Sequence, residues 1–126
     1  MRAFRVLAIL LVAITIAGCS KSKFRTYNGP EVTRVIVAKE DRRLWLMHND
    51  EVLKSYPMEL GFAPSGHKQF EGDGKTPEGT YYIDRRNPNR SFHLSLGITY
   101  PNAQDRAFAK NAGKSPGGGI IIHGRP

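Results

Sequence analysis

The chain has 126 residues, a length that suits one domain and excludes two of ordinary size. Its 13 glycines and 8 prolines predict many turns, which favours a β-rich domain over a helical bundle. The formal net charge of +8 favours an acidic partner such as nucleic acid, anionic lipid or an anionic polymer.

The first 18 residues predict a signal peptide. Arg2 and Arg5 give a basic start, and residues 6–18 are almost entirely apolar. This stretch is too short to span a bilayer, which needs about 20 residues. It ends in Ile-Ala-Gly-Cys, which resembles a bacterial lipobox and predicts acylation of Cys19, the single cysteine of the sequence. The alternative is an ordinary secretory signal cut nearby, with Cys19 incidental.

These features predict an exported protein, lipid-anchored to the membrane and facing the periplasm or cell wall. Residues 19–30 are expected to form a linker and residues 31–126 the domain. The basic residues Lys21, Lys23 and Arg25 suit anionic lipid head groups or wall polymer, or form a solvated tether. A single cysteine allows no disulfide within the chain. The inner and the outer membrane both remain open.

The first half of the domain predicts a hairpin and a long loop. Residues 32–38 are β-branched and alternating, and residues 43–48 alternate around Trp45, so both are expected to be strands. The return strand is expected at 52–60, where Pro57 marks a sheet edge or a break. Residues 61–79 are glycine-rich and polar, and predict a loop.

The second half predicts three more strands and one helix. Strands are expected at 80–84, 91–98 and 120–122, the last of them buried, with a basic turn at 85–90. Residues 102–112 predict a helix capped by Asn102, with Asp105 near its positive end and Gly113 ending it.

His123 directly follows the apolar strand and precedes a glycine, so its ring is expected to emerge at a rigid strand end. Such a position favours catalysis, because a catalytic side chain must be held precisely in place. Without context, a structural role is the commoner one for such a histidine. The spacing of the four histidines predicts no metal site, and no cofactor is expected.

Three motifs give the context. Residues 72–83 read GDGKTPEGTYYI, residues 92–102 read FHLSLGITYPN, and residues 116–124 read PGGGIIIHG. In this order they resemble the L,D-transpeptidase catalytic domain family (YkuD-type), in its murein transpeptidase branch. The resemblance covers roughly residues 32–126. Gly119 departs from the pattern, since the branch usually has aspartate there.

The resemblance implies a mainly β fold, an L,D-transpeptidase-like β-sandwich of mixed sheets with one short helix. It also implies acyl transfer between peptidoglycan stem peptides through a thioester. His123 matches the base that activates the thiol, and Gly124 matches the residue whose carbonyl orients that base. His93 and Tyr100 are expected to line the donor cleft, although a half-buried structural histidine is the alternative for His93.

In this family the nucleophilic cysteine lies in a further segment beyond the last motif, and these 126 residues do not include it. The resemblance therefore predicts a domain that is incomplete at its C-terminus and inactive as it stands. The expected partners are stem peptides and, through the anchor, a membrane. Nucleic acid is not expected to bind, and the chain is expected to be a monomer.

Two alternatives stay open: a peptidoglycan hydrolase or amidase of the same family, with water as acceptor, and a non-catalytic wall-binding lipoprotein. Two other motifs are rejected. Gly74-Lys75-Thr76 ends like a Walker motif, but Gln69 stands where that motif needs glycine. The S-x-x-K of residues 65–68 lies in a loop rather than at the start of a helix.

Overall fold

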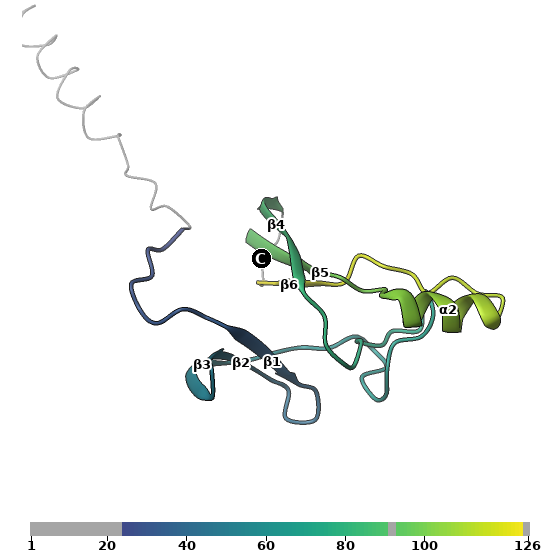
Figure 1. Ribbon diagram of the computed structural model, residues 1–126, viewed down its shortest axis with the longest axis horizontal. Coiled ribbons are helices and arrows are strands. Elements are labelled where there is room, and N and C mark those ends of the chain that lie inside the picture. The colour runs from purple at the N-terminus through teal and green to yellow at the C-terminus, as the bar shows by residue number, and fades with distance from the viewer. Residues whose placement is uncertain (1–23, 91–92, 125–126) are drawn as a thin grey trace, which may run out of the picture.

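The computed structural model describes residues 24–90 and 93–124 (Figure 1). Within them the mainly β prediction is confirmed, because six strands form two three-stranded sheets and there is one nine-residue helix. The predicted signal peptide and Cys19 lie outside the described residues. The elements in chain order are β1 (Arg34–Ala38), β2 (Arg43–His48), β3 (Glu51–Pro57), β4 (Ile83–Arg90), β5 (His93–Ile98), α2 (Ala103–Asn111) and β6 (Ile121–His123).

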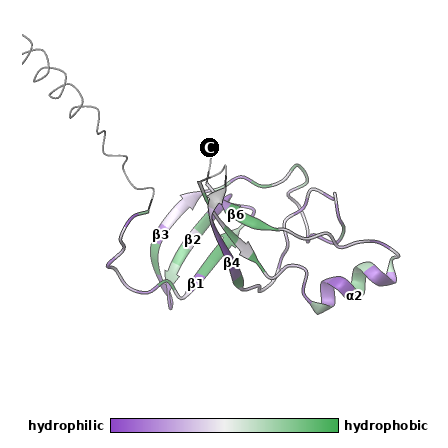
Figure 2. Cartoon of the chain, turned by 90° about the horizontal axis from the view of Figure 1, so that it is seen from above, coloured by the Kyte–Doolittle hydropathy of each residue, from purple (hydrophilic) through white to green (hydrophobic). Residues whose placement is uncertain are grey.

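The first sheet is an antiparallel meander in the order β1-β2-β3. Leu44 and Met47 of the central strand β2 are buried, with exposed fractions of 8% and 6%. Figure 2 shows hydrophobic colouring on β1 and β2, and also on β6 of the second sheet. Strand β3 lies at an edge, in agreement with the prediction from Pro57. It ends at Pro57 and not at residue 60 as expected, because proline has no N–H to donate to a further ladder.

The second sheet has the order β4-β5-β6. The basic turn predicted at 85–90 is wrong: β4 runs from Ile83 to Arg90 and pairs with β5. Strand β4 lies at the edge of the sheet, where a proline such as Pro88 can be accommodated because one side of the strand needs no hydrogen-bond donors. The register between β4 and β5 shifts between Asn87 and Arg90. Pairing with β5 thus outweighs the turn preference of the Arg-Asn-Pro-Asn sequence.

Two further expectations need correction. The strand predicted as buried is half-buried at Ile121 and Ile122, since in the described part of the chain β6 pairs only with β5. Every described strand pairing is antiparallel, so the expected mixture of parallel and antiparallel strands is not found among these residues. The two-sheet, mainly β arrangement itself agrees with the prediction.

Helix α2 begins as predicted. The Asn102 side chain accepts hydrogen bonds from the backbone N–H groups of Gln104 and Asp105, and the Asp105 carboxylate accepts one from the Asn102 N–H. This reciprocal capping box satisfies N–H groups that a helix start leaves unpaired. The helix ends before Gly113, whose φ of +66° suits a glycine. In the described part of the chain, no helix combines the length and the apolar character that crossing a membrane requires.

Polar side chains supply much of the interior around α2 and the 61–79 loop. The buried apolar residues of the described chain are Leu44, Met47, Tyr100 and Ala109, and the buried polar ones are Lys68, Ser95 and Asp105. Such groups are stable in an interior only when they are hydrogen-bonded, and no buried side-chain polar atom of the described residues lacks a partner. These contacts therefore position the loop against the helix.

Candidate functional site

His123 is the last residue of β6, and its side chain is exposed. Its Nδ1 atom lies 2.8 Å from the carbonyl oxygen of Gly124. A carbonyl can only accept, so Nδ1 carries the proton and Nε2 is the basic nitrogen of the neutral ring. Strand and neighbouring carbonyl together fix the orientation of an imidazole whose Nε2 can take a proton from an acid such as a thiol.

The strand register places Ser95 of β5 directly opposite His123. Ser95 is buried, with 4% of its surface exposed, whereas His123 is exposed. His93 begins β5 two positions earlier, and the surroundings of its side chain lie outside what the structure describes. The cleft contact expected of His93 therefore stays a prediction.

Tyr100 is 3% exposed, and its hydroxyl donates a hydrogen bond of 2.9 Å to the carbonyl of Pro116. Its ring packs edge-on against Tyr81 at a centroid distance of 5.9 Å and against His67 at 6.5 Å. Burial raises its pKa to about 12. This packing ties the loop before β6 to the interior and does not support the predicted substrate contact, which stays untested.

A second histidine lies in a hydrogen-bonded cluster with Asp105. His67 Nε2 is 3.1 Å from one carboxylate oxygen, while the Tyr81 hydroxyl donates to the other at 3.0 Å. Burial and the bond to Asp105 raise the pKa of Tyr81. The cluster joins the 61–79 loop, the segment before β4 and the start of α2. His67 and Asp105 are 38 positions apart, so no local sequence pattern predicts their contact.

The geometry of His67 excludes the role of general base for its neutral ring. Its Nδ1 accepts a hydrogen bond of 2.9 Å from the backbone N–H of Glu78, so Nε2 must carry the proton that Asp105 accepts. Both nitrogens are therefore occupied. The His-Asp pair resembles part of a catalytic triad but positions the loop instead.

Lys39 anchors the same loop to the first sheet. Its ammonium donates to the carbonyls of Gly66 at 2.6 Å and Thr76 at 3.1 Å, and to the Glu78 carboxylate at 2.7 Å. The bond from Lys39 holds the pKa of Glu78 below its ordinary value. All three donors of the ammonium are used, so Lys39 fixes where the loop stands.

A buried ion pair closes the glycine-rich turn. Lys68 donates to Asp73 at 2.9 Å and to the carbonyl of Phe70 at 2.8 Å. Burial alone would raise the pKa of Asp73, but hydrogen bonds from the N–H groups of Phe70, Gln69 and Lys75 and from Lys68 hold it well below its usual range. Asp73 is therefore a structural carboxylate.

A cavity of about 560 Å³ opens beside the His67–Asp105 cluster. Among the described residues its lining combines the cluster with the segment 78–81 and the start of α2, and includes neither His123 nor Gly124. No group of three His, Cys, Asp or Glu side chains within residues 24–90 and 93–124 could hold a metal ion. In the described part of the chain, the histidine at the end of β6 therefore lies outside the lining of this cavity.

The model of the L,D-transpeptidase catalytic domain (YkuD) matches residues 32–126, which is most of the chain and every described element. The chain belongs to the L,D-transpeptidase family. L,D-transpeptidases as a family are acyltransferases that act on peptidoglycan stem peptides, and the predicted family is confirmed.

Two curated relatives agree with this assignment. The proteins described as "Putative L,D-transpeptidase YafK" from Escherichia coli strain K12 and from Escherichia coli O157:H7 are each 33% identical over 94 residues. These cover 70% of this chain and 36% of the relative, so the chain spans about a third of the relatives' length. No solved structure matches the chain.

Sequence reasoning on this L,D-transpeptidase domain singled out His123, Gly124 and the glycine-rich motif, and the catalytic roles of the two residues stay predictions. It missed the contacts that hold the motif in place. Asp73 and Glu78 lie inside the motif. Their partners are Lys68 and Lys39, and no sequence motif identifies either lysine as a partner. Asp105 was recognised only as a charge at the helix start, whereas it also binds Tyr81 and His67. A carboxylate that caps a helix with one oxygen can accept further hydrogen bonds with the other. This property of Asp105 could have suggested additional partners.

Proposed function

We propose that this domain is a peptidoglycan L,D-transpeptidase in which His123 activates a cysteine thiol. The observation that carries the proposal is the 2.8 Å contact between His123 Nδ1 and the Gly124 carbonyl at the end of a paired strand. It leaves Nε2 as the atom that takes the thiol proton. The expected donor is a stem peptide that loses its terminal D-alanine.

The chemistry proceeds in two balanced steps. The thiolate attacks the carbonyl carbon of the donor peptide bond, and the proton held by His123 passes to the leaving amine as the thioester forms. The amine of a second stem then attacks the thioester, gives its proton to His123 and releases the thiol. With water in place of this amine, the same steps make a hydrolase, and only the acceptor distinguishes the two activities.

The test supplies the thiol. Residues 1–126 are fused to the part of the Escherichia coli relative that follows its matched region, and the fusion is incubated with muropeptides. New cross-linked products support the transpeptidase, whereas shortened stems support the hydrolase. His123→Ala is expected to abolish either product, and replacing the supplied cysteine by serine is the matched control. Products that survive His123→Ala contradict the assignment of the base.

A non-catalytic wall-binding lipoprotein is the second candidate, which would hold muropeptides without converting them. A fusion that folds, as judged by circular dichroism, yet binds muropeptides without converting them favours this candidate.

We further propose that Cys19 carries a lipid anchor, that export brings the monomeric domain to the wall side of the membrane, and that residues 19–30 link the two. The support is the apolar stretch 6–18 and the Ile-Ala-Gly-Cys sequence that ends it. Labelled palmitate is expected to enter the protein and to be absent from Cys19→Ala. Equal labelling of the variant contradicts the anchor.

A further inference from the structure

We propose that the cavity beside the start of α2 binds an uncharged sugar of the N-acetylated hexosamine class, as found in wall glycan strands. The inference that the sugar comes from the cell wall rests on the proposed function. The preference of the cavity for a neutral ligand does not depend on that function. The site is separate from His123, which is not among the residues that line it.

The charged groups around the cavity are already compensated by protein partners. Asp105 accepts from His67, the Tyr81 hydroxyl and the Asn102 N–H, and it is buried at 8% exposure. Glu78 is paired with Lys39 at 2.7 Å. A cationic ligand would have to compete with Lys39, and an anionic one would face two carboxylates. The cavity therefore favours a neutral ligand.

The start of α2 offers no anion site either. The Asn102 side-chain oxygen accepts from the N–H groups of both Gln104 and Asp105, at 2.9 and 3.0 Å. These are the donors that would otherwise point at a phosphate or carboxylate. Because the cap occupies them, these two donors are not available to an anion in the cavity.

The groups that remain for a ligand are neutral. The Thr80 hydroxyl and the Gln104 amide are exposed at the cavity, and among the described residues neither has a hydrogen-bond partner. The backbone of Gly79 and Thr80 is likewise unpaired within that part of the chain, since β4 begins only at Ile83. A hydroxyl and an amide each donate and accept, so they suit a ligand whose groups do the same.

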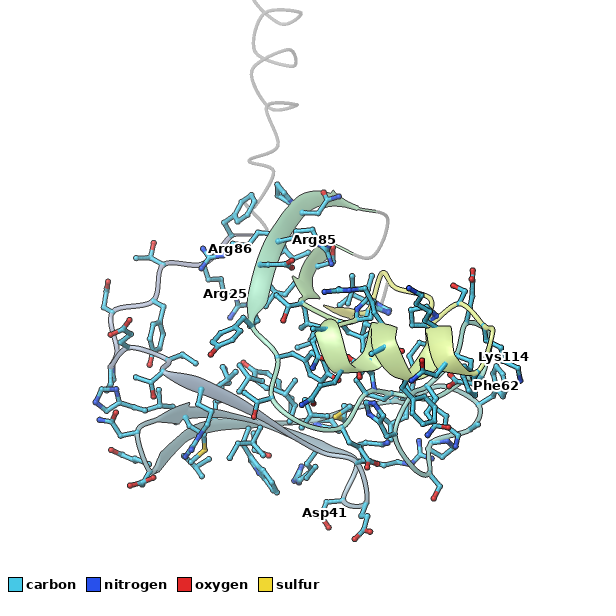
Figure 3. The ribbon with its side chains drawn as sticks, turned by 45° about the vertical axis from the view of Figure 1, so that its right-hand side comes forward. Arg25, Asp41, Phe62, Arg85, Arg86 and Lys114 are labelled. Carbon is cyan, nitrogen blue, oxygen red and sulfur yellow. The ribbon has the colours of Figure 1, made fainter. Side chains whose placement is uncertain are left out.

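A sugar with hydroxyl and acetamide groups has that character, whereas a peptide brings charged termini or side chains. A volume of about 560 Å³ lies within the usual range of small-ligand sites, about 300–1,000 Å³. Figure 3 shows Arg85 and Arg86 extending from β4, well apart from Phe62 and Lys114 near the other end of the domain. Neither arginine lines the cavity, so neither can contact a ligand bound there directly.

The test titrates the full chain in detergent micelles with N,N′-diacetylchitobiose and follows backbone amides by NMR. Saturable shifts are expected at Gly79, Thr80 and Gln104. Gln104→Ala is expected to weaken binding by about three- to tenfold, the range for one hydrogen bond. Asn111→Ala removes a similar exposed amide at the other end of α2 and is expected to leave the affinity unchanged.

The proposal is overturned if chitobiose gives no saturable shift at these amides, or if Gln104→Ala and Asn111→Ala behave alike. It is also overturned if a charged stem peptide, and not the sugar, saturates the site. Binding that persists in His123→Ala supports a separate site, and binding lost there refutes it. Because no thiol takes part in this titration, sugar binding can stand while the transpeptidase fusion fails, and the reverse can occur.

Discussion

The imidazole of His67 accepts a hydrogen bond at Nδ1, whereas the imidazole of His123 donates one from the same atom. The first bond comes from the backbone N–H of Glu78 at 2.9 Å, and the second goes to the carbonyl of Gly124 at 2.8 Å. A backbone N–H can only donate and a carbonyl can only accept, so the two neutral rings must be opposite tautomers. In the neutral rings the proton therefore sits on Nε2 of His67 and on Nδ1 of His123.

Long-range proton–nitrogen NMR of the neutral rings is therefore expected to show a protonated Nε2 at His67 and a protonated Nδ1 at His123. Asp105→Asn removes the carboxylate that accepts from His67 Nε2 and is expected to perturb the His67 signals alone. The same tautomer at both rings would contradict the hydrogen bonds described for one of them. Asn102→Ala leaves both histidine contacts in place and is the control.

The capping box of α2 could be predicted because Asn102 and Asp105 are three positions apart, and the signal is local. The first hairpin was equally readable from the alternation in β2. β4 was not, since its Arg-Asn-Pro-Asn sequence favours a turn and only the pairing with β5 makes it a strand. The His67–Asp105 cluster depends on the tertiary fold and has no local signal.

Asp73→Asn is expected to destabilise the fold by about 2–3 kcal/mol, because it leaves the Lys68 ammonium buried beside a neutral amide. The Lys68 and Asp73 side chains are only 8% and 15% exposed, and their ion pair measures 2.9 Å. Urea denaturation of the full chain measures the free energy of unfolding. Asp50→Asn is the matched control: its ion pair with Arg34 is longer at 3.5 Å and fully exposed at the aspartate, so the free energy of unfolding is expected to stay unchanged.

The same carboxylate gives a pH dependence of defined sign. The fold holds the pKa of Asp73 well below its usual range, so its stabilising effect is present above the ordinary value of about 4. It is lost as the pH falls from there toward the folded pKa, because the unfolded chain binds the proton first. The acid-induced loss of stability is expected to be smaller in Asp73→Asn than in Asp50→Asn. Equal losses would contradict this role for Asp73.

Gly61→Ala is expected to disturb the 61–79 loop more than Gly72→Ala does. A Cβ at Gly61 would lie 2.3 Å from the carbonyl oxygen of Gly74, so backbone must move and about 2–3 kcal/mol is expected. At Gly72 nothing lies within 4 Å, and only the φ of +77° opposes alanine, at about 1 kcal/mol. Hydrogen exchange at the Ala63 amide, which donates to Gly74, is expected to quicken in Gly61→Ala alone. Equal effects of the two variants would mean that the close approach is not maintained in solution.

Alkaline pH tests the buried tyrosines around Asp105. Burial raises the pKa of Tyr100 to about 12, so the fold favours the protonated phenol, and that stabilisation is complete below the ordinary value of about 10. This stabilisation falls as the pH rises from about 10 to about 12, because the unfolded chain releases the proton first. The loss in the free energy of unfolding is at most about 1.4 kcal/mol per pH unit. Tyr100→Phe is expected to flatten this decline in urea denaturation, whereas Tyr82→Phe, at a side chain 75% exposed, is expected to leave it unchanged. Both variants keep the same lysines, so lysine titration cancels in the comparison, and identical slopes would show that Tyr100 reaches water in the folded chain.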